Sequence, residues 1–258
     1  FDGEIICADS RTIYKGLDIG TAKPSKLEQG GIKHFGLDLI NPDEAFSASE
    51  FVRSARKWAS QIKKRGKLPI IVGGTGLYID SLYYKYTFTN KADINLRNKL
   101  DKLTIEELQS YIKKAGYEMP ENYKNKRYLM RTIERGGASS YRNTPDRGSL
   151  IVGIYPGKEI LEERIIKRGQ LMFNSGVIEE CRRLFKSYGY DAPGASGNIY
   201  QALTPYFRDD ESIEVCKKDF VSRDKNLAKR QMTWFKRNKD IRWFEDTESA
   251  EKFLDSIL

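Results

Sequence analysis

Two short apolar runs constrain the fold of this chain more than any other feature of its sequence. The first, EIICAD at residues 4–9, ends in Asp9, and the second, LPIIVGGTG at residues 68–76, ends in glycines. Short runs that are apolar on both faces are typical of parallel strands buried inside a sheet. Between them, Ser47 and Glu50 have the spacing of a capping box at a helix start. A strand, a helix and a second strand predict an α/β fold with a parallel sheet.

The middle of the chain follows a helical pattern instead. From Lys91 to about Arg142, apolar residues recur at helical spacing and no strand pattern interrupts them. The chain then resumes with a strand pattern, SLIVGIYP at residues 149–156, which we expect to return to the sheet. Further helices are expected around residues 158–173, 176–187, 199–207 and 211–236, with a last strand at 240–245. We therefore predict an α/β core of residues 1–90 and 143–258, and a helical insertion domain of residues 91–142.

Charge is the compositional feature that bears most on function. The chain has a formal net charge of +9 and a single histidine, His34, which excludes a metal site built from several histidines. Basic residues are concentrated in residues 91–142 and 217–239. Two basic regions favour binding of a long polyanion, although a solvated lysine-rich surface would have the same composition.

The sequence gives no sign of secretion or of membrane insertion. It contains no run of eighteen apolar residues and no signal-peptide pattern, so we expect a cytoplasmic protein without membrane contact. The three cysteines are far apart and odd in number, which favours core positions over a disulfide framework. No amphipathic helix is left over to bind a partner, and we therefore expect a monomer.

Asp9 stands at the carboxyl end of a predicted strand, where ligands bind in open α/β sheets. A carboxylate there can accept a proton or hold a magnesium ion, whereas an isolated Asp more often caps a turn. The loop after it, SRTIYKGLDIGTAKP, mixes hydroxyls, cations and glycines, which suits closure over a polyanionic ligand. In VGGTGLY the glycines allow close backbone approach and Thr75 adds a hydroxyl, although glycine-rich turns are common in α/β folds.

Two later segments combine cations with aromatic rings. In NKRYLMRTIE, Arg127 and Arg131 are four residues apart and share a helix face, which suits a phosphate clamp as well as an ordinary exposed surface. The segment LAKRQMTWFKRNKDIRWF, residues 227–244, brings lysines and tryptophans together, as nucleic-acid binders do. For Trp234 and Trp243 we favour a structural role, in which both rings anchor the last helix and strand in the core.

These segments in this order closely resemble the tRNA dimethylallyltransferases, also called tRNA isopentenyltransferases. The resemblance rests on ADSRTIYKGLDIGTAKP, NPDEAFSASEF, RGKLPIIVGGTGLYI, NKRYLMRTIE and AKRQMTWF, and it extends from Phe1 to about Trp243. It implies a P-loop NTPase-like parallel sheet core with an inserted α-helical tRNA-binding domain. It also implies transfer of a dimethylallyl group from dimethylallyl diphosphate to the exocyclic amine of the adenosine on the 3′ side of the anticodon, in the anticodon stem-loop of tRNA.

The resemblance further implies roles for individual residues. Asp9 corresponds to the proposed general base, and Thr75 and Arg97 correspond to positions that contact the tRNA or its target base, so all three are predicted catalytic residues. The expected cofactor is Mg²⁺, with Asp9 as its possible ligand. The full set of predicted tRNA-binding residues is Asp9, Ser10, Arg11, Thr12, Thr75, Arg97, Arg127, Arg131, Lys229, Arg230 and Gln231.

The sequence also departs from the family pattern. Family members carry a first strand and a Gly-x-x-x-x-Gly-Lys-Thr phosphate loop before the Asp9 motif, and both are absent from this sequence. No diphosphate-binding residue is therefore assigned, and we expect the loop to be lost from the sequence rather than from the natural protein. Ser196 replaces a cation or an amide of many relatives, and Asp224 and Lys225 replace a Thr-Arg pair. Two alternatives stay open: a non-catalytic or truncated homologue that binds tRNA without transfer, and an adenylate isopentenyltransferase.

Overall fold

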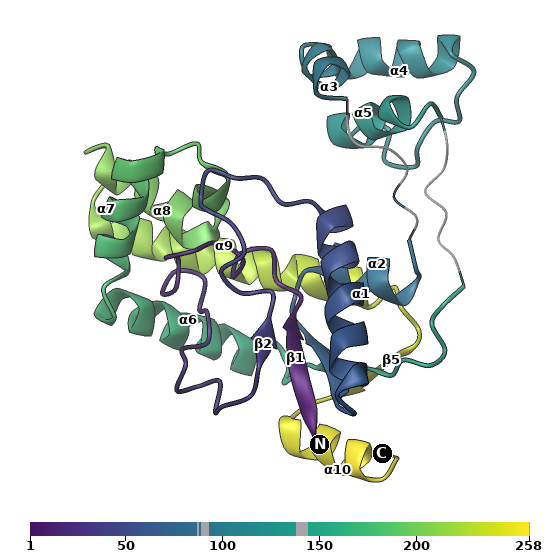
Figure 1. The fold of residues 1–258 in the computed structure, drawn as a ribbon. Coiled ribbons are helices and arrows are strands. Elements are labelled where there is room, and N and C mark those ends of the chain that lie inside the picture. The colour runs from purple at the N-terminus through teal and green to yellow at the C-terminus, as the bar shows by residue number, and fades with distance from the viewer. Residues whose placement is uncertain (87, 89–92, 138–143, 258) are drawn as a thin grey trace. The chain divides into compact units, whose positions relative to one another are not determined.

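A computed structural model describes residues 1–86, 88, 93–137 and 144–257 (Figure 1). The chain forms two compact units. Unit 1 consists of Phe1–Leu82 and Arg147–Leu258, and unit 2 consists of Tyr83–Asp146. Unit 2 is therefore inserted, in sequence, between the two halves of unit 1.

Unit 1 contains a three-stranded parallel sheet. Strands β1 (Gly3–Cys7), β2 (His34–Phe35) and β3 (Leu68–Val72) are arranged in the order β2-β1-β3, with Cys7 opposite Val72. Helix α1 (Ala48–Lys64) connects β2 to β3 and packs on β1 and β3 (Figure 1). The predicted parallel α/β arrangement is thus confirmed, as is the capping box, in which Ser47 and Glu50 each accept a hydrogen bond from the other's backbone N–H.

A second, two-stranded sheet lies in the other half of unit 1. Strands β4 (Ile151–Ile154) and β5 (Ile241–Phe244) pair in parallel, with Ile151 opposite Ile241. Within the described residues β4 is hydrogen-bonded to β5 and not to β1–β3. The expectation that residues 149–156 return to the first sheet is therefore wrong, because IRWF supplies β4 with a parallel partner along its whole length. Helix α10 (Thr247–Asp255), which the sequence analysis did not predict, packs against this small sheet.

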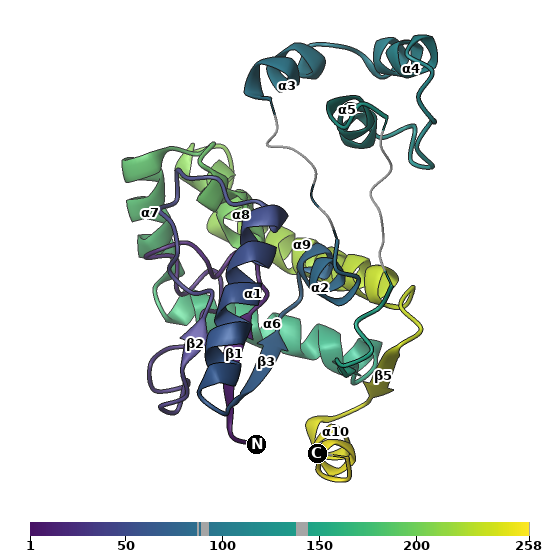
Figure 2. The ribbon, with the colours of Figure 1, turned by 45° about the vertical axis from the view of Figure 1, so that its right-hand side comes forward.

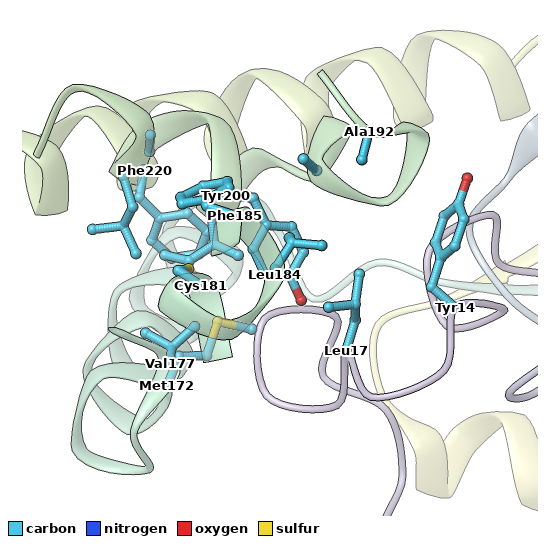
Figure 3. Close-up of a cluster of buried hydrophobic side chains, with 14 of the residues drawn as sticks. Tyr14, Leu17, Met172, Val177, Cys181, Leu184, Phe185, Ala192, Tyr200 and Phe220 are labelled. Carbon is cyan, nitrogen blue, oxygen red and sulfur yellow. The ribbon is translucent and has the colours of Figure 1, made fainter. Parts of the chain in front are cut away.

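One hydrophobic core of unit 1 is formed mainly by helices. It is formed by α6 (Lys158–Asn174), α7 (Val177–Tyr188), the 3-10 turn η1 (Pro193–Ser196), α8 (Asn198–Phe207) and α9 (Ile213–Phe235), and α9 packs on both α6 and α8 (Figure 2). Tyr14 and Leu17, from the loop after β1, enter the same buried cluster as Val177, Tyr200 and Phe220 (Figure 3). This loop therefore joins the end of β1 to the helical core.

Unit 2 is built from three short helices, α3 (Ile94–Asp101), α4 (Ile105–Lys114) and α5 (Lys126–Glu134). Their apolar faces meet in a separate core that contains Leu100, Leu108 and Leu129. The helical pattern predicted for this part of the chain is confirmed by these three helices within the described residues. Helix α2 (Gly76–Tyr83), which was not predicted, leads into this part of the chain.

No helix within the described ranges is both long enough and apolar enough to span a bilayer. The core position expected for Trp243 is wrong. This residue lies on β5 and is 37% exposed, so its ring is not enclosed in the core. Its ring covers Gly153 on the neighbouring strand, where a Cβ would lie 2.6 Å from it. The ring therefore shields the backbone of β4 while one side stays in solvent.

The core of unit 2 makes a stability prediction. Leu108→Ala removes a fully buried side chain and should lower the free energy of unfolding of unit 2 by about 2–5 kcal/mol, since a cavity forms where the side chain was. Hydrogen exchange of residues 93–137 in the full chain measures this loss. Tyr111→Ala, on the same helix but 45% exposed, is the control and should cost less than about 1 kcal/mol. Equal losses in the two variants would contradict the described core.

Candidate functional site

The site is built where β1 and β3 end side by side. Ala8 donates its N–H to the carbonyl of Val72 at 2.7 Å, and Thr75 donates its N–H to the carbonyl of Ala8 at 3.2 Å. Ser10 in turn donates its N–H to Oγ1 of Thr75 at 3.0 Å. Asp9 lies between these bonded residues, and Asp9 and Thr75 are both half-buried. The structure thus brings together two of the three residues predicted to be catalytic.

Asp9 is oriented by a local turn, and two neutral side chains, Cys7 and Tyr78, lie near it. Its Oδ1 accepts the N–H of Arg11 at 2.6 Å, and Oδ2 accepts no hydrogen bond from any described residue. Burial, assisted by the nearby Asp9, raises the pKa of Cys7 to about 11. Burial also raises the pKa of Tyr78, whose ring stacks on Phe51 with the centroids 4.0 Å apart. Neither the thiol nor the phenol carries charge near neutral pH.

The glycines of the segment Gly73–Gly76 are required by close packing. A Cβ on Gly73 would overlap the carbonyl of Ala8, one on Gly74 would overlap the amide of Gln231, and one on Gly76 would overlap the ring of Trp234. This packing explains the glycines without any ligand.

Helix α9 holds this glycine segment from the outside. Gln231 donates from Nε2 to the carbonyl of Gly74 at 3.0 Å, and Trp234 donates from Nε1 to Oδ2 of Asp80 at 3.0 Å. Trp234 therefore anchors α9, in agreement with the structural role expected for it. Of the residues predicted to bind tRNA on this helix, Lys229 and Arg230 are exposed, whereas Gln231 supports the segment that carries Thr75.

The predicted ligand-binding residues in the loop after Asp9 differ in how deeply they are buried. Ser10 and Arg11 are half-buried, and Nη1 of Arg11 donates to Oγ of Ser196 on η1. Thr12 is only 7% exposed, and its hydroxyl has no hydrogen-bond partner among the described residues. Ser10 and Arg11 thus border the site, while Thr12 lies beneath it.

Two buried charged side chains fix the rest of the loop: Lys23, one of the loop cations expected to suit a polyanionic ligand, and Glu180, which the sequence analysis missed. Lys23 donates from Nζ to the carbonyl of Tyr14 and to the carboxylates of Asp18 and Asp38, at 2.6–2.7 Å. Glu180 on α7 is 2% exposed and accepts hydrogen bonds from the loop backbone. A signal for Glu180 was present, because it occupies a core position of the helical pattern that buries Val177, Cys181 and Leu184.

The third predicted catalytic residue, Arg97, lies in unit 2. Its Nε is 3.7 Å from Oε1 of Glu134, whose side chain is 6% exposed. Arg131 donates from Nη1 to Oε2 of the same carboxylate at 3.2 Å. Burial lowers the pKa of Arg131 while Glu134 raises it, and the guanidinium stays charged at neutral pH. Arg127 is exposed on the same helix. One carboxylate therefore gathers two predicted tRNA-binding arginines, from α3 and from α5.

The oxygen atoms at the ends of β1 and β3 suit a metal site with a single carboxylate ligand. The described residues contain no group of three or more His, Cys, Asp and Glu side chains that could hold a metal ion. Asp9, with the hydroxyls of Ser10 and Thr75 beside it, could supply one carboxylate ligand. Such a site suits Mg²⁺, which commonly takes one or two carboxylates and completes its shell with substrate phosphates and water.

Asp224 and Lys225, where the sequence departs from the family pattern, make intramolecular contacts. Asp224 is buried and accepts hydrogen bonds from Arg168 and Asn198. Lys225 donates to Oε2 of Glu162 at 2.7 Å. Both side chains are therefore used to pack α9 against α6 and α8.

Comparison with known proteins gives matches along nearly the whole chain. The sequence model of the family described as "IPP transferase" matches residues 12–238. A tRNA dimethylallyltransferase of Bacillus cereus is 36% identical over 266 residues, which cover 97% of this chain and 84% of that protein.

Solved structures give the same result. The tRNA isopentenylpyrophosphate transferase of Staphylococcus epidermidis superposes with a TM-score of 0.72 at 33% identity, covering 100% of this chain and 89% of that one. A eukaryotic dimethylallyltransferase described as acting on tRNA superposes with a TM-score of 0.82 over 98% of this chain and 72% of that one. Since its sequence identity is 21%, this second likeness concerns the fold alone.

The contact between Gly73 and Ala8 can be tested directly. Gly73→Ala should separate the two strand ends, because the added methyl group would overlap a backbone carbonyl that cannot move without breaking the sheet. We expect a loss of stability in urea unfolding larger than the roughly 1–2 kcal/mol that a left-handed backbone costs a residue with a Cβ. Gly66→Ala, just after α1, is the control for backbone strain without overlap, because Gly66 has a φ of +75° and no atom lies near its Cβ. A Gly73→Ala protein as stable as the Gly66→Ala protein would contradict the close approach.

Proposed function

This chain belongs to the IPP transferase family, and from this premise we propose that it is a tRNA dimethylallyltransferase. It transfers a dimethylallyl group from dimethylallyl diphosphate to the exocyclic amine of the adenosine on the 3′ side of the anticodon. The observation that carries the proposal is the hydrogen-bonded pairing of the Asp9 and Thr75 segments at the carboxyl ends of β1 and β3. Sequence identity of 36% over 97% of the chain supports the same activity.

In the reaction, the adenine amine attacks the allylic carbon, the bond from this carbon to the diphosphate oxygen breaks, and diphosphate leaves with the electron pair. The amine is a weak nucleophile because its lone pair is shared with the ring, so a base that takes its proton accelerates the step. Asp9 is this base in our proposal. Because Oδ1 is occupied by the N–H of Arg11, the free Oδ2 is the atom that receives the proton.

Thr75 and Arg11 place the reacting groups. The hydroxyl of Thr75 already accepts the N–H of Ser10, so its orientation is fixed before substrate binds. We propose that Ser10, Arg11 and Thr75 contact the target nucleotide. Thr12 is buried below them and supports the loop without touching the nucleotide. The target base has to leave the anticodon-loop stack to reach Asp9, as in other enzymes that modify a base.

In our proposal the chain has a P-loop NTPase-like core with a tRNA-binding insertion at residues 91–142. Arg97, Arg127 and Arg131 contact the RNA backbone there, and Lys229 and Arg230 do so from α9. Gln231 acts indirectly, through its bond to Gly74. These cations argue against a free adenine nucleotide as the acceptor, since a mononucleotide does not need them. When bound, Mg²⁺ would neutralise the diphosphate leaving group, and the second lone pair of Oδ1 of Asp9, which Arg11 does not use, is what Asp9 could offer to it while Oδ2 acts as the base. A cytoplasmic location and a monomeric state stay predictions from the sequence.

The role of Asp9 as a base makes a sharp prediction. Asp9→Asn keeps an oxygen that can accept the N–H of Arg11 but cannot take a proton, so transfer to tRNA should fall by about 10²–10⁴-fold. Single-turnover transfer of a labelled prenyl group measures the rate. Affinity for tRNA is the control and should change by less than about threefold. Full activity in the Asp9→Asn protein would refute the role of Asp9, and a wild-type chain that binds tRNA without transfer would favour the non-catalytic alternative.

The arginines of unit 2 predict the salt dependence of tRNA binding. Replacing Arg97 and Arg131 with Gln removes two phosphate contacts and should make the slope of log K against log salt concentration shallower by about 1.4–1.8. Filter binding at several salt concentrations measures this slope. Lys113→Gln with Lys114→Gln, which removes the same charge from α4, is the matched control and should change the slope less. Equal changes would mean that only the net charge of unit 2 matters.

A further inference from the structure

We propose that Glu180 is a positioning residue for the transfer reaction. Its carboxylate, on α7, fixes the loop that begins with Asp9, and through this loop it holds Asp9 and Arg11 in place. The inference rests on the proposed function, since positioning is defined by the reaction that it serves. It assigns a task to a buried acidic residue that no catalytic step uses.

The carboxylate of Glu180 receives hydrogen bonds from four donors. Oε2 accepts the N–H groups of Asp18 and Ile19 at 2.7 and 2.8 Å. Oε1 accepts the N–H of Gly20 and the hydroxyl of Tyr200, both at 2.8 Å. Three of these donors are consecutive backbone amides of one loop. The side chain therefore replaces the partners that this backbone segment would otherwise find in a strand or a helix.

These bonds link Glu180 to the site by a second route. Tyr200 lies on α8, directly after η1, and η1 carries Ser196, the acceptor of the Arg11 guanidinium. Arg11 also donates its backbone N–H to Asp9, and its carbonyl accepts the N–H of Tyr14. The same carboxylate thus holds the far end of the loop directly, and through Tyr200 it is bonded to α8, the helix that follows the turn holding the near end.

Among the described residues, no other side chain from outside the loop is hydrogen-bonded to the backbone of residues 16–22. Lys23 ties the carbonyl of Tyr14 to Asp18, which fixes the internal shape of the loop. Glu180 fixes that shaped loop to α7. Gly20 packs so tightly here that a Cβ on it would lie 2.6 Å from the hydroxyl of Tyr200. Loop, helix and tyrosine therefore fit in one arrangement only.

The chemistry of the site requires a carboxylate and not an amide. All four partners of the side chain are donors, so both oxygens have to accept. A glutamine at this position would turn its NH₂ group toward at least one N–H and leave that donor without an acceptor in a buried place. The loop should then detach locally while the helical core around it stays folded.

The test compares Glu180→Gln with Glu179→Gln in the full chain. Glu179 is the preceding residue on α7, but it is exposed and, among the described residues, pairs only with Arg182, so its variant controls for the loss of one charge. For Glu180→Gln we expect kcat for prenyl transfer to tRNA to fall about 10- to 100-fold, as small misplacements of catalytic groups do. KM for tRNA should stay within about twofold, and amide exchange should accelerate in residues 18–20 before the rest of unit 1. Glu179→Gln should match the wild type in all three measurements.

A second variant keeps the inference testable if Glu180→Gln does not fold. Gly20→Ala leaves the carboxylate in place but pushes the loop away from Tyr200, so it should lower kcat with little change in KM. Folded Glu180→Gln or Gly20→Ala proteins with wild-type kcat would overturn the inference. So would a loss of activity explained entirely by a higher KM. An inactive wild-type chain would instead refute the proposed function, and the exchange rates of residues 18–20 would still report whether Glu180 holds the loop.

Discussion

The close approach of two backbone segments is the constraint on which the site depends. Gly73 lies so near the carbonyl of Ala8 that a side chain cannot fit between them, and this contact lets Thr75 bond to both Ala8 and Ser10. Asp9 obtains its place from this pairing, since it is held between two residues that are bonded to the neighbouring strand end. The parallel sheet thus supplies the site with geometry before any ligand enters, which is the usual advantage of the carboxyl edge of parallel strands.

Two buried carboxylates hold parts of the molecule outside the sheet in place, and they do so in different ways. Within the described part of the chain, Glu180 forms no ion pair, and its carboxylate accepts hydrogen bonds from three backbone amides and one hydroxyl. Glu134 in unit 2 is the opposite case, because it is shared by the two arginines Arg97 and Arg131. A buried carboxylate surrounded by donors fixes a loop rigidly, whereas one that pairs with half-exposed guanidinium groups keeps them ordered and leaves their outer donors free for an anion.

The local part of this structure could be predicted from the sequence, and the long-range part could not. The strand that ends before Asp9, the capping box of Ser47 and the helical periodicity of unit 2 are all encoded by neighbouring residues. The pairing of β4 with β5 is not, because it joins segments about ninety residues apart that each carry only four paired positions. The expected burial of Trp243 was wrong for a related reason. The sequence places its ring on one face of a strand but does not show whether another part of the chain covers that face.

The support that α9 gives to the glycine segment has a consequence for how the protein is made. Gln231 and Gly74 are separated by 157 residues, and Trp234 and Asp80 by 154 residues. While the chain leaves the ribosome, β1 and β3 are therefore available long before the helix that packs on Thr75 and its neighbours has been synthesised. The site is among the last parts of unit 1 to be completed, and a nascent chain that stalls before α9 leaves the glycine segment after β3 without the helix that supports it.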